Sequence, residues 1–282
     1  GLVFNVVLDP VLIFGIGPFP ELGVSGAAAA TVTAQALVSL LFFKAVLREK
    51  VLFPHLRLWV LVPVKVWREI VRIGVPSAVQ NLIYAGISMI LTRLITGWGD
   101  LAVAAQRVGS QIESVSWMVG DGFSAAVNAF LGQNYGAKRY DRVRRGYFCA
   151  IAMTAAWGLC TTFLLIGMAR LLFSIFLQGE EVMAIGVNYL RIVGLSQMFM
   201  MVEQTSIGAF SGLGRTLYPS IISVTFTSAR IPVAVLLSSV MGLSGIWWAL
   251  SISSMVKGCI LFVSFVVFLY VFLERKKDEK TV

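Results

Sequence analysis

The sequence predicts an all-α integral membrane protein, and three observations support this fold class. Apolar residues make up 58% of the 282 positions and the mean hydropathy is +0.85. Charged residues amount to 13%, about half the share found in a soluble domain. Apolar runs recur along the chain at lengths close to the ~20 residues that cross a bilayer as a helix. We therefore expect a multi-pass protein whose main partner is the lipid bilayer.

The N-terminal part of the chain predicts two helices. Residues 1–14 are apolar apart from Asn5 and Asp9, and the Gly- and Pro-containing turn 15–22 separates them from the apolar run 23–47. The basic segment 48–65 then interrupts the pattern with two prolines. We expect this segment to be a loop that links two parts of the protein.

The rest of the chain predicts six more helices. Each apolar run ends where charged residues or a glycine turn interrupt it. The predicted spans are 66–96, 101–133, 146–177, 182–212, 217–240 and 243–273, followed by a charged tail at 274–282.

The charged residues of the loops are distributed asymmetrically. The loops 15–22, 97–100, 178–181 and 241–243 contain no basic residue. The alternate loops and the C-terminus hold 17 of the 23 basic residues, namely Lys44, Arg48, Lys50, Arg57, Lys65, Arg68, Arg72, Lys138, Arg139, Arg142, Arg144, Arg145, Arg215, Arg275, Lys276, Lys277 and Lys280. By the positive-inside rule, these loops and the C-terminus are predicted to be cytoplasmic, in the inner membrane of a cell. The net charge of +9 is thereby explained without nucleic-acid binding.

Several function classes find no support in the sequence. The three cysteines lie in apolar stretches and the single histidine, His55, has no cysteine or second histidine near it, so we expect no disulfide framework and no metal centre built on them. The sequence contains no phosphate-binding loop of the kind that ATP-driven pumps use, and no Gly-x-Ser-x-Gly or His-Glu-x-x-His motif. We therefore expect neither an enzyme nor a cofactor.

Two stretches of the chain resemble each other. Asn5–Pro10 followed by Gly23–Ala30 parallels Thr227–Pro232 followed by Gly242–Ala249. In both, a polar residue precedes a proline by five positions, and the next helix opens with Gly-[Val/Leu]-Ser-Gly. The two pairs lie six spans apart, as two six-helix halves would require. On this interpretation four helices precede Gly1, although small residues are common in membrane helices and chance similarity is the alternative.

Together these motifs resemble the multidrug and toxic compound extrusion (MATE) family. The most specific string is Gly132–Ala137, which is similar to the end of the family's eighth helix. The other matching strings are Asn5–Pro10, Gly23–Thr31, Gly74–Ala78, Ala104–Gln106, Ser211–Thr216 and Arg230–Pro232. They correspond to parts of helices five to eleven, and the chain as a whole would cover helices five to twelve.

The resemblance implies a two-lobed transporter of six plus six helices. Residues 1–47 would be the last two helices of the first lobe, 48–65 a cytoplasmic linker, 66–273 the second lobe and 274–282 a cytoplasmic tail. It also implies a monomeric antiporter that exports cationic amphipathic drugs by alternating access, driven by protons or sodium ions.

Asp9 is the first candidate for the coupling site, since a carboxylate in an apolar helix usually faces a cavity. It lies about 9 Å below the outer loop and Thr31 about 13 Å below it, at 1.5 Å per residue. Asn5 is one turn from Asp9 and shares its face. These oxygen atoms suit a proton or a sodium ion; the alternative is that Asp9 is solvated at the interface. In the archaeal and DinF-like branch of the family the matching positions belong to the coupling site, together with a first-helix aspartate.

A substrate cavity is the second candidate site, with Glu113, Glu203, Gln111, Tyr84 and Arg230 as candidate lining residues. Glu113 lies about 19 Å below the outer loop, near the midplane of the bilayer. Glu203 is either cavity-facing or solvated. Tyr84 stands where members that resemble NorM carry a seventh-helix glutamate, which puts the cation site of that branch in doubt here.

Two alternatives concern arginines. Glu113 could form a structural pair with Arg93, Arg107 or Arg230. The same three arginines would suit a lipid-linked oligosaccharide flippase of the same superfamily, which is the alternative function.

Overall fold

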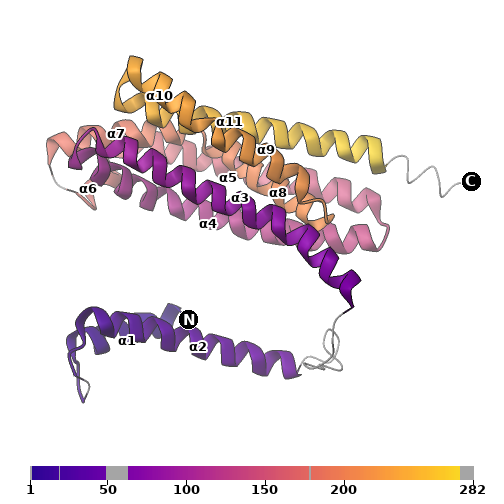
Figure 1. Ribbon diagram of the computed structural model, residues 1–282, viewed down its shortest axis with the longest axis horizontal. Coiled ribbons are helices and arrows are strands. Elements are labelled where there is room, and N and C mark those ends of the chain that lie inside the picture. Colours follow the sequence, from indigo (N-terminus) through magenta and orange to yellow (C-terminus); the bar gives the residue numbers. More distant parts are fainter. Residues whose placement is uncertain (1, 19, 49–62, 178, 274–282) are drawn as a thin grey trace, which may run out of the picture. The chain divides into compact units, whose positions relative to one another are not determined.

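The computed structural model describes residues 2–18, 20–48, 63–177 and 179–273 (Figure 1). All regular structure in these ranges is helical, which confirms the predicted all-α class. The chain divides into two compact units, Gly1–Pro63 and Val64–Val282.

The first unit consists of α1 (Leu2–Phe14) and α2 (Gly23–Arg48), which pack against each other. Gly26 lies so close to the backbone of Leu12 that a Cβ atom on Gly26 would collide with the Leu12 carbonyl. The two helices can therefore approach only because residue 26 has no side chain. Gly245, the corresponding glycine of the sequence repeat, meets the carbonyl of Leu237 in the same way.

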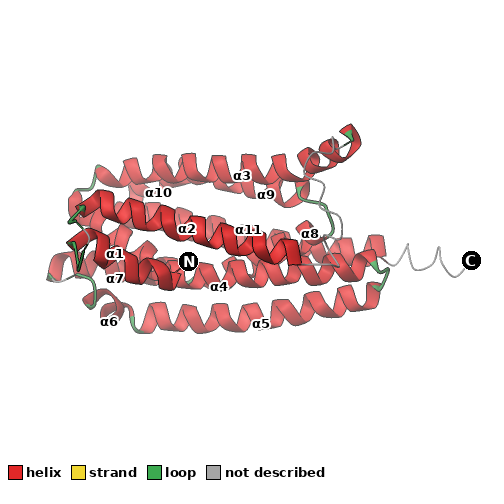
Figure 2. Ribbon diagram, turned by 90° about the horizontal axis from the view of Figure 1, so that it is seen from below, coloured by secondary structure: helices red, strands yellow, loops and turns green. Residues whose placement is uncertain are grey.

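The second unit is a helical bundle whose members run side by side (Figure 2). Its helices are α3 (Val64–Thr96), α4 (Asp100–Gly136), α5 (Tyr140–Gly167), α6 (Ala169–Ser174), α7 (Glu180–Gly194), α8 (Gln197–Gly212), α9 (Leu217–Ser228), α10 (Arg230–Met241) and α11 (Leu243–Phe268), followed by a π-helical turn (Leu269–Leu273).

Helix α8 lies at the centre of this bundle. It packs against α4, α5 and α11, and none of its residues is exposed. Glycines allow the close contacts: a Cβ atom on Gly132 of α4 would lie 2.9 Å from the carbonyl oxygen of Gly212, and one on Gly258 of α11 would collide with the carbonyl of Phe199. The strings Gly132–Ala137 and Ser211–Thr216 thus meet at one end of the bundle.

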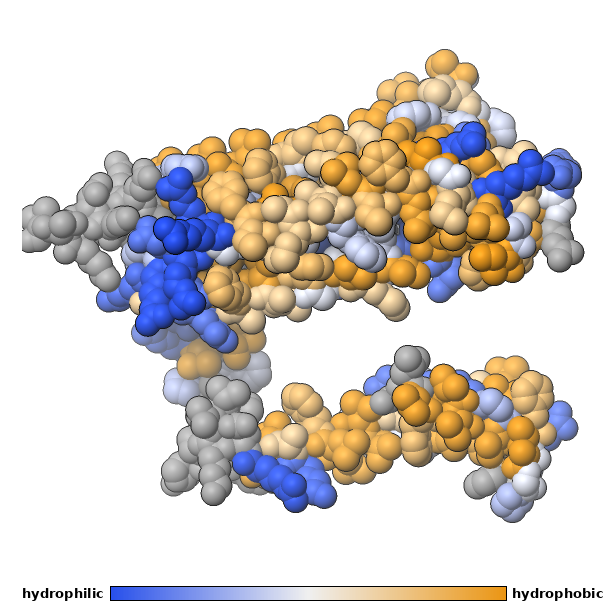
Figure 3. Space-filling view, turned by 180° about the vertical axis from the view of Figure 1, so that it is seen from behind, coloured by the Kyte–Doolittle hydropathy of each residue, from blue (hydrophilic) through white to orange (hydrophobic). Residues whose placement is uncertain are grey.

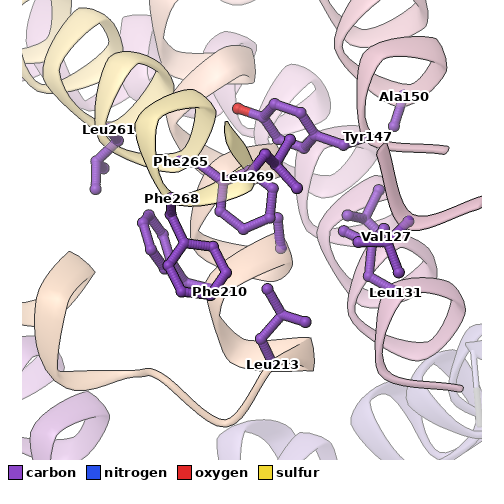
Figure 4. Packing of buried hydrophobic residues seen from close by; sticks show 12 residues of the cluster. Val127, Leu131, Tyr147, Ala150, Phe210, Leu213, Leu261, Phe265, Phe268 and Leu269 are labelled. Atoms are coloured by element: carbon purple, nitrogen blue, oxygen red, sulfur yellow. The ribbon is translucent and has the colours of Figure 1, made fainter. Parts of the chain in front are cut away.

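The main apolar cluster lies at the same end, between α4, α5, α8 and α11 (Figure 4). The rings of Phe210 and Phe265 meet edge to face with their centroids 4.9 Å apart. Tyr147 is fully buried beside them, and its hydroxyl group is 2.9 Å from Ser206 Oγ. These contacts therefore tie α8 to α5 and α11 at this end.

Three of the predicted spans are interrupted. The span predicted at 182–212 is bent by 49° between α7 and α8. Hydroxyl groups of neighbouring helices stabilise the break, since Thr162 donates to the carbonyl of Gly194 (2.9 Å) and Ser251 to that of Ile192 (2.7 Å).

The other two breaks lie between α9 and α10 and between α5 and α6. The span 217–240 is interrupted at Ala229, because Pro232 has no N–H group to donate to the carbonyl four residues earlier; α9 and α10 still continue as one span. The span 146–177 ends at Gly167, and the short helix α6 follows Met168.

The predicted loop 48–65 is shorter than expected, because α2 includes Arg48 and α3 begins at Val64. Residues 49–62 of this loop and the predicted tail 274–282 lie outside the described residues.

By length and composition, five helices of the described chain can cross a membrane, or six if the bent pair α7–α8 counts as one span. This is fewer than the eight predicted spans. Helix α1 is short, and α4 is long enough but carries Arg107, Glu113 and Asp121. The face of the second unit seen in Figure 3 is nevertheless mostly apolar over its middle, and the strongly hydrophilic residues lie near its ends.

Candidate functional site

The second unit contains a cavity of about 640 Å³. Residues of α3, α4 and α7 to α11 line it, and most of them are polar. A polar cavity inside an apolar bundle is the arrangement expected of a binding site for a small molecule or ion.

A buried ion pair forms part of the cavity wall. Lys257 Nζ of α11 lies 2.7 Å from Glu203 Oε1 of α8, and the two side chains are only 5% and 9% exposed. Glu203 is therefore not solvated, and the ammonium group of Lys257 neutralises its charge. Its second oxygen, Oε2, is buried and has no hydrogen-bond partner among the described residues.

Glu113 is the other buried carboxylate of the cavity. It is 4% exposed and forms no salt bridge in the described part of the chain, where Arg170–Glu180 and Lys257–Glu203 are the two ion pairs. The side chains of Tyr189 and Gln197 are its polar neighbours. The pairing of Glu113 with an arginine that we considered from the sequence is not found.

Gln197 begins α8 next to the helix break, and its side chain is fully buried. Neither its amide oxygen nor its amide nitrogen has a hydrogen-bond partner of good geometry within the described ranges, and the same holds for Glu113 Oε1. Buried polar groups are seldom left unpaired. Glu113 thus contributes to the lining a buried carboxylate without a counter-charge among the described residues, and Gln197 is a buried neighbour of it outside the lining.

Arg230 supplies a second buried cation of the cavity wall. Its guanidinium group donates to Ser253 Oγ (3.1 Å) and Ser254 Oγ (2.9 Å) of α11. The guanidinium carbon also lies 6.0 Å from the ring centroid of Tyr84, whose ring in turn lies 6.2 Å from that of Trp117.

The structure brings together four of the five candidate cavity residues, since Tyr84, Glu113, Glu203 and Arg230 all line the cavity. Gln111 is exposed and is not part of the lining. Arg93 and Arg107 are also exposed and do not line it either. Lys257 and Gln197 were not among the candidates. A lone lysine within the apolar run 243–273 was the available signal for Lys257, whereas nothing in the sequence marks Gln197.

The candidate coupling residues lie in the first unit. The Oδ1 atoms of Asn5 and Asp9 are buried and have no hydrogen-bond partner among the described residues. Thr31 is exposed, and its hydroxyl group donates to the carbonyl of Ala27 in its own helix (3.0 Å). Within the described ranges no group of three or more His, Cys, Asp or Glu side chains could hold a metal ion.

The sequence matches one protein family and several curated relatives. Residues 76–236 match the family model described as MatE. A probable multidrug resistance protein NorM of Thermotoga maritima is 31% identical over 257 residues, which cover 86% of this chain and 53% of that protein. An FAD transporter of Shewanella oneidensis is 26% identical over 262 residues, which cover 91% of this chain and 57% of that protein.

The fold also matches solved structures. One is the outward-facing conformation of a multidrug resistance MATE family transporter of the MOP superfamily, with a TM-score of 0.86 and 21% identity, covering 97% of this chain and 61% of the other. The chain spans little more than half the length of the curated relatives it matches.

Proposed function

The chain belongs to the MatE family, and on this premise we propose that it forms part of a cation-coupled antiporter that exports cationic amphipathic molecules by alternating access. Relatives that bear the name of multidrug resistance proteins support export of small molecules. The basic loops support an orientation with the C-terminus in the cytoplasm. The protein would act as a monomer in the inner membrane of the cell.

The buried, unpaired carboxylate of Glu113 is the observation that carries the substrate assignment. A carboxylate held away from water without a counter-charge is costly, and a cationic ligand removes that cost. Glu203 has no such need, because Lys257 already neutralises it. We therefore assign recognition of the positive charge to Glu113, with Tyr84 and Trp117 as aromatic surfaces for the rest of the substrate.

We assign coupling to Asp9, assisted by Asn5 and Thr31. Thr31 is included because of its position along α2. A carboxylate in an apolar helix is inexpensive to bury when a proton or a sodium ion neutralises it and costly when it is bare. The coupling ion would therefore bind more strongly to one conformation than to the other, as a conformational shift requires. The unpaired Oδ1 atoms of Asn5 and Asp9 support this assignment. The division of the chain into two compact units fits a separate proposal, that 1–47 and 66–273 belong to different lobes.

A pair of substitutions in the intact transporter tests both assignments. We expect Asp9→Asn to abolish gradient-driven efflux of ethidium from vesicles while equilibrium ethidium binding persists. We expect Glu113→Gln to weaken binding more than it weakens coupling. Efflux by Asp9→Asn at nearly the wild-type rate would refute the coupling assignment and transfer that role to another carboxylate.

The flippase alternative loses support from the geometry. A cavity for a lipid-linked oligosaccharide diphosphate is expected to present several arginines, but only Arg230 of the three candidate arginines lines this one. Transfer of a fluorescent lipid-linked oligosaccharide across vesicles containing the intact protein would restore that alternative.

A further inference from the structure

We propose that Lys257 restricts this cavity to substrates with a single positive charge, because its ammonium group neutralises the Glu203 carboxylate. The inference rests on the proposed function, since it assumes that the cavity binds cations. Lys257 would determine specificity without touching the substrate, by acting through Glu203.

The contact itself supports this role. Lys257 Nζ lies 2.7 Å from Glu203 Oε1, a distance typical of a charge-assisted hydrogen bond. The second oxygen, Oε2, has no hydrogen-bond partner within the described ranges, but the ammonium group already neutralises the charge that an amine of a substrate would seek. Displacement of Lys257 would leave a buried ammonium group without a partner, which is strongly unfavourable. A substrate therefore gains little from Glu203 while the lysine is present.

The remaining charges of the cavity limit the substrate further. The charged lining residues are Glu113, Asp121, Glu203, Arg230 and Lys257, so three acidic groups face two basic groups and the formal charge is −1. One positive charge on the substrate neutralises the lining as a whole. Asp121 is exposed, so water screens its charge, and the four buried charges sum to zero, which leaves no further negative charge for a second cationic group.

A second positive charge would meet repulsion from two buried cations. Arg230 is held in place by Ser253 and Ser254, and Lys257 is held by Glu203, so neither side chain can turn away without losing its partners. Electrostatic repulsion is stronger in such a water-poor site than at the surface. We therefore expect monocations to bind better than dications of the same shape.

Ethidium and propidium provide the test, since they share one phenanthridinium ring system and carry one and two permanent positive charges respectively. Binding of each dye to the purified intact protein is measured by fluorescence anisotropy. The substitution Lys257→Gln retains a hydrogen-bond donor for Glu203 but removes the positive charge. We expect it to shift the ratio of propidium to ethidium affinity towards propidium by about tenfold or more, equivalent to ~1.4 kcal/mol.

Two control variants separate charge from structure. Lys257→Arg keeps the positive charge and should preserve the wild-type affinity ratio. Glu203→Gln combined with Lys257→Gln removes both charges and should return the ratio to the wild-type value, because the net charge of the cavity is then unchanged. A merely structural role of Lys257 would alter the affinity for both dyes together and leave their ratio constant.

An unchanged ratio in folded Lys257→Gln would overturn the inference. If that variant does not fold, Glu113→Gln decides the question in the presence of the native lysine. Loss of ethidium binding by Glu113→Gln supports the inference, because Lys257 neutralises Glu203 and Glu203 then cannot replace Glu113. Retained ethidium binding would overturn the inference. A wild-type protein that binds neither dye would refute the proposed function and the inference with it, while a wild-type protein that binds both dyes equally would refute the inference alone.

Discussion

The close approach of α4 and α8 can be tested by adding one methyl group at Gly208. A Cβ atom at this position would collide with the carbonyl oxygen of Ser124 and lie 2.7 Å from Ser124 Oγ and 2.9 Å from the carbonyl carbon. The obstacle is largely backbone, so a change of rotamer cannot relieve it and the two helices must separate. Overpacking of this kind costs about 1–3 kcal/mol.

Gly122→Ala is the matched control, because the same substitution in α4 meets no heavy atom within 4 Å. Both variants gain about 0.5–1 kcal/mol from replacing a glycine in a helix, so the difference between them reports the packing cost alone. At about 2–4 °C per kcal/mol for a domain of this size, Gly208→Ala should unfold roughly 2–12 °C below Gly122→Ala. Tryptophan fluorescence of the purified protein during heating in detergent measures this difference, and a Gly208→Ala midpoint equal to or above that of Gly122→Ala would refute the reasoning.

Three further predictions concern a buried ion pair, a hydrogen bond between helices and the topology of one loop. Lys257→Met should lower the free energy of unfolding by about 3–5 kcal/mol, because it leaves Glu203 buried without a partner. The additional change Glu203→Gln should recover most of that loss. Denaturation midpoints in detergent check both expectations. Thr216→Val should cost about 1–2 kcal/mol, since it removes the hydrogen bond to the Ile73 carbonyl (2.9 Å) that joins the start of α9 to α3, and the same measurement applies. Arg139→Cys should react with a membrane-impermeant thiol reagent only after the cells are opened, because the loop before α5 is predicted to be cytoplasmic; labelling from outside intact cells would contradict this topology.

The helices of the fold could be predicted from the sequence, whereas their interruptions could not. The ends of α1, α2 and α11 follow the limits of apolar runs, because burial in lipid demands apolar side chains on most faces. The bend between α7 and α8 lies inside a single predicted span, and Gly194, Ser196 and Gln197 around it do not form the pattern of a loop. It is stabilised by Thr162 and Ser251 from other helices, and such tertiary contacts are not visible in local sequence.

The candidate site was predictable to a similar degree. Glu113 and Glu203 stand out because carboxylates are rare in membrane helices. Whether each one has a partner depends on a helix elsewhere in the chain, and only the fold reveals that Lys257 pairs with Glu203 and not with Glu113. The exposed position of Gln111, two residues before Glu113, likewise depends on the rotation of α4 within the bundle.

The pairing of Glu203 with Lys257 has a consequence for the synthesis of the protein. The two residues are 54 positions apart, so α8 leaves the ribosome well before α11 does. A lone charge near the centre of a membrane helix opposes insertion by about 2.5–3.5 kcal/mol, and in the folded bundle none of the residues of α8 is exposed. The helix therefore has to remain sheltered by the insertion machinery or by earlier helices until α11 supplies the ammonium group. The innermost helix of the bundle would thus be among the last to reach its final environment.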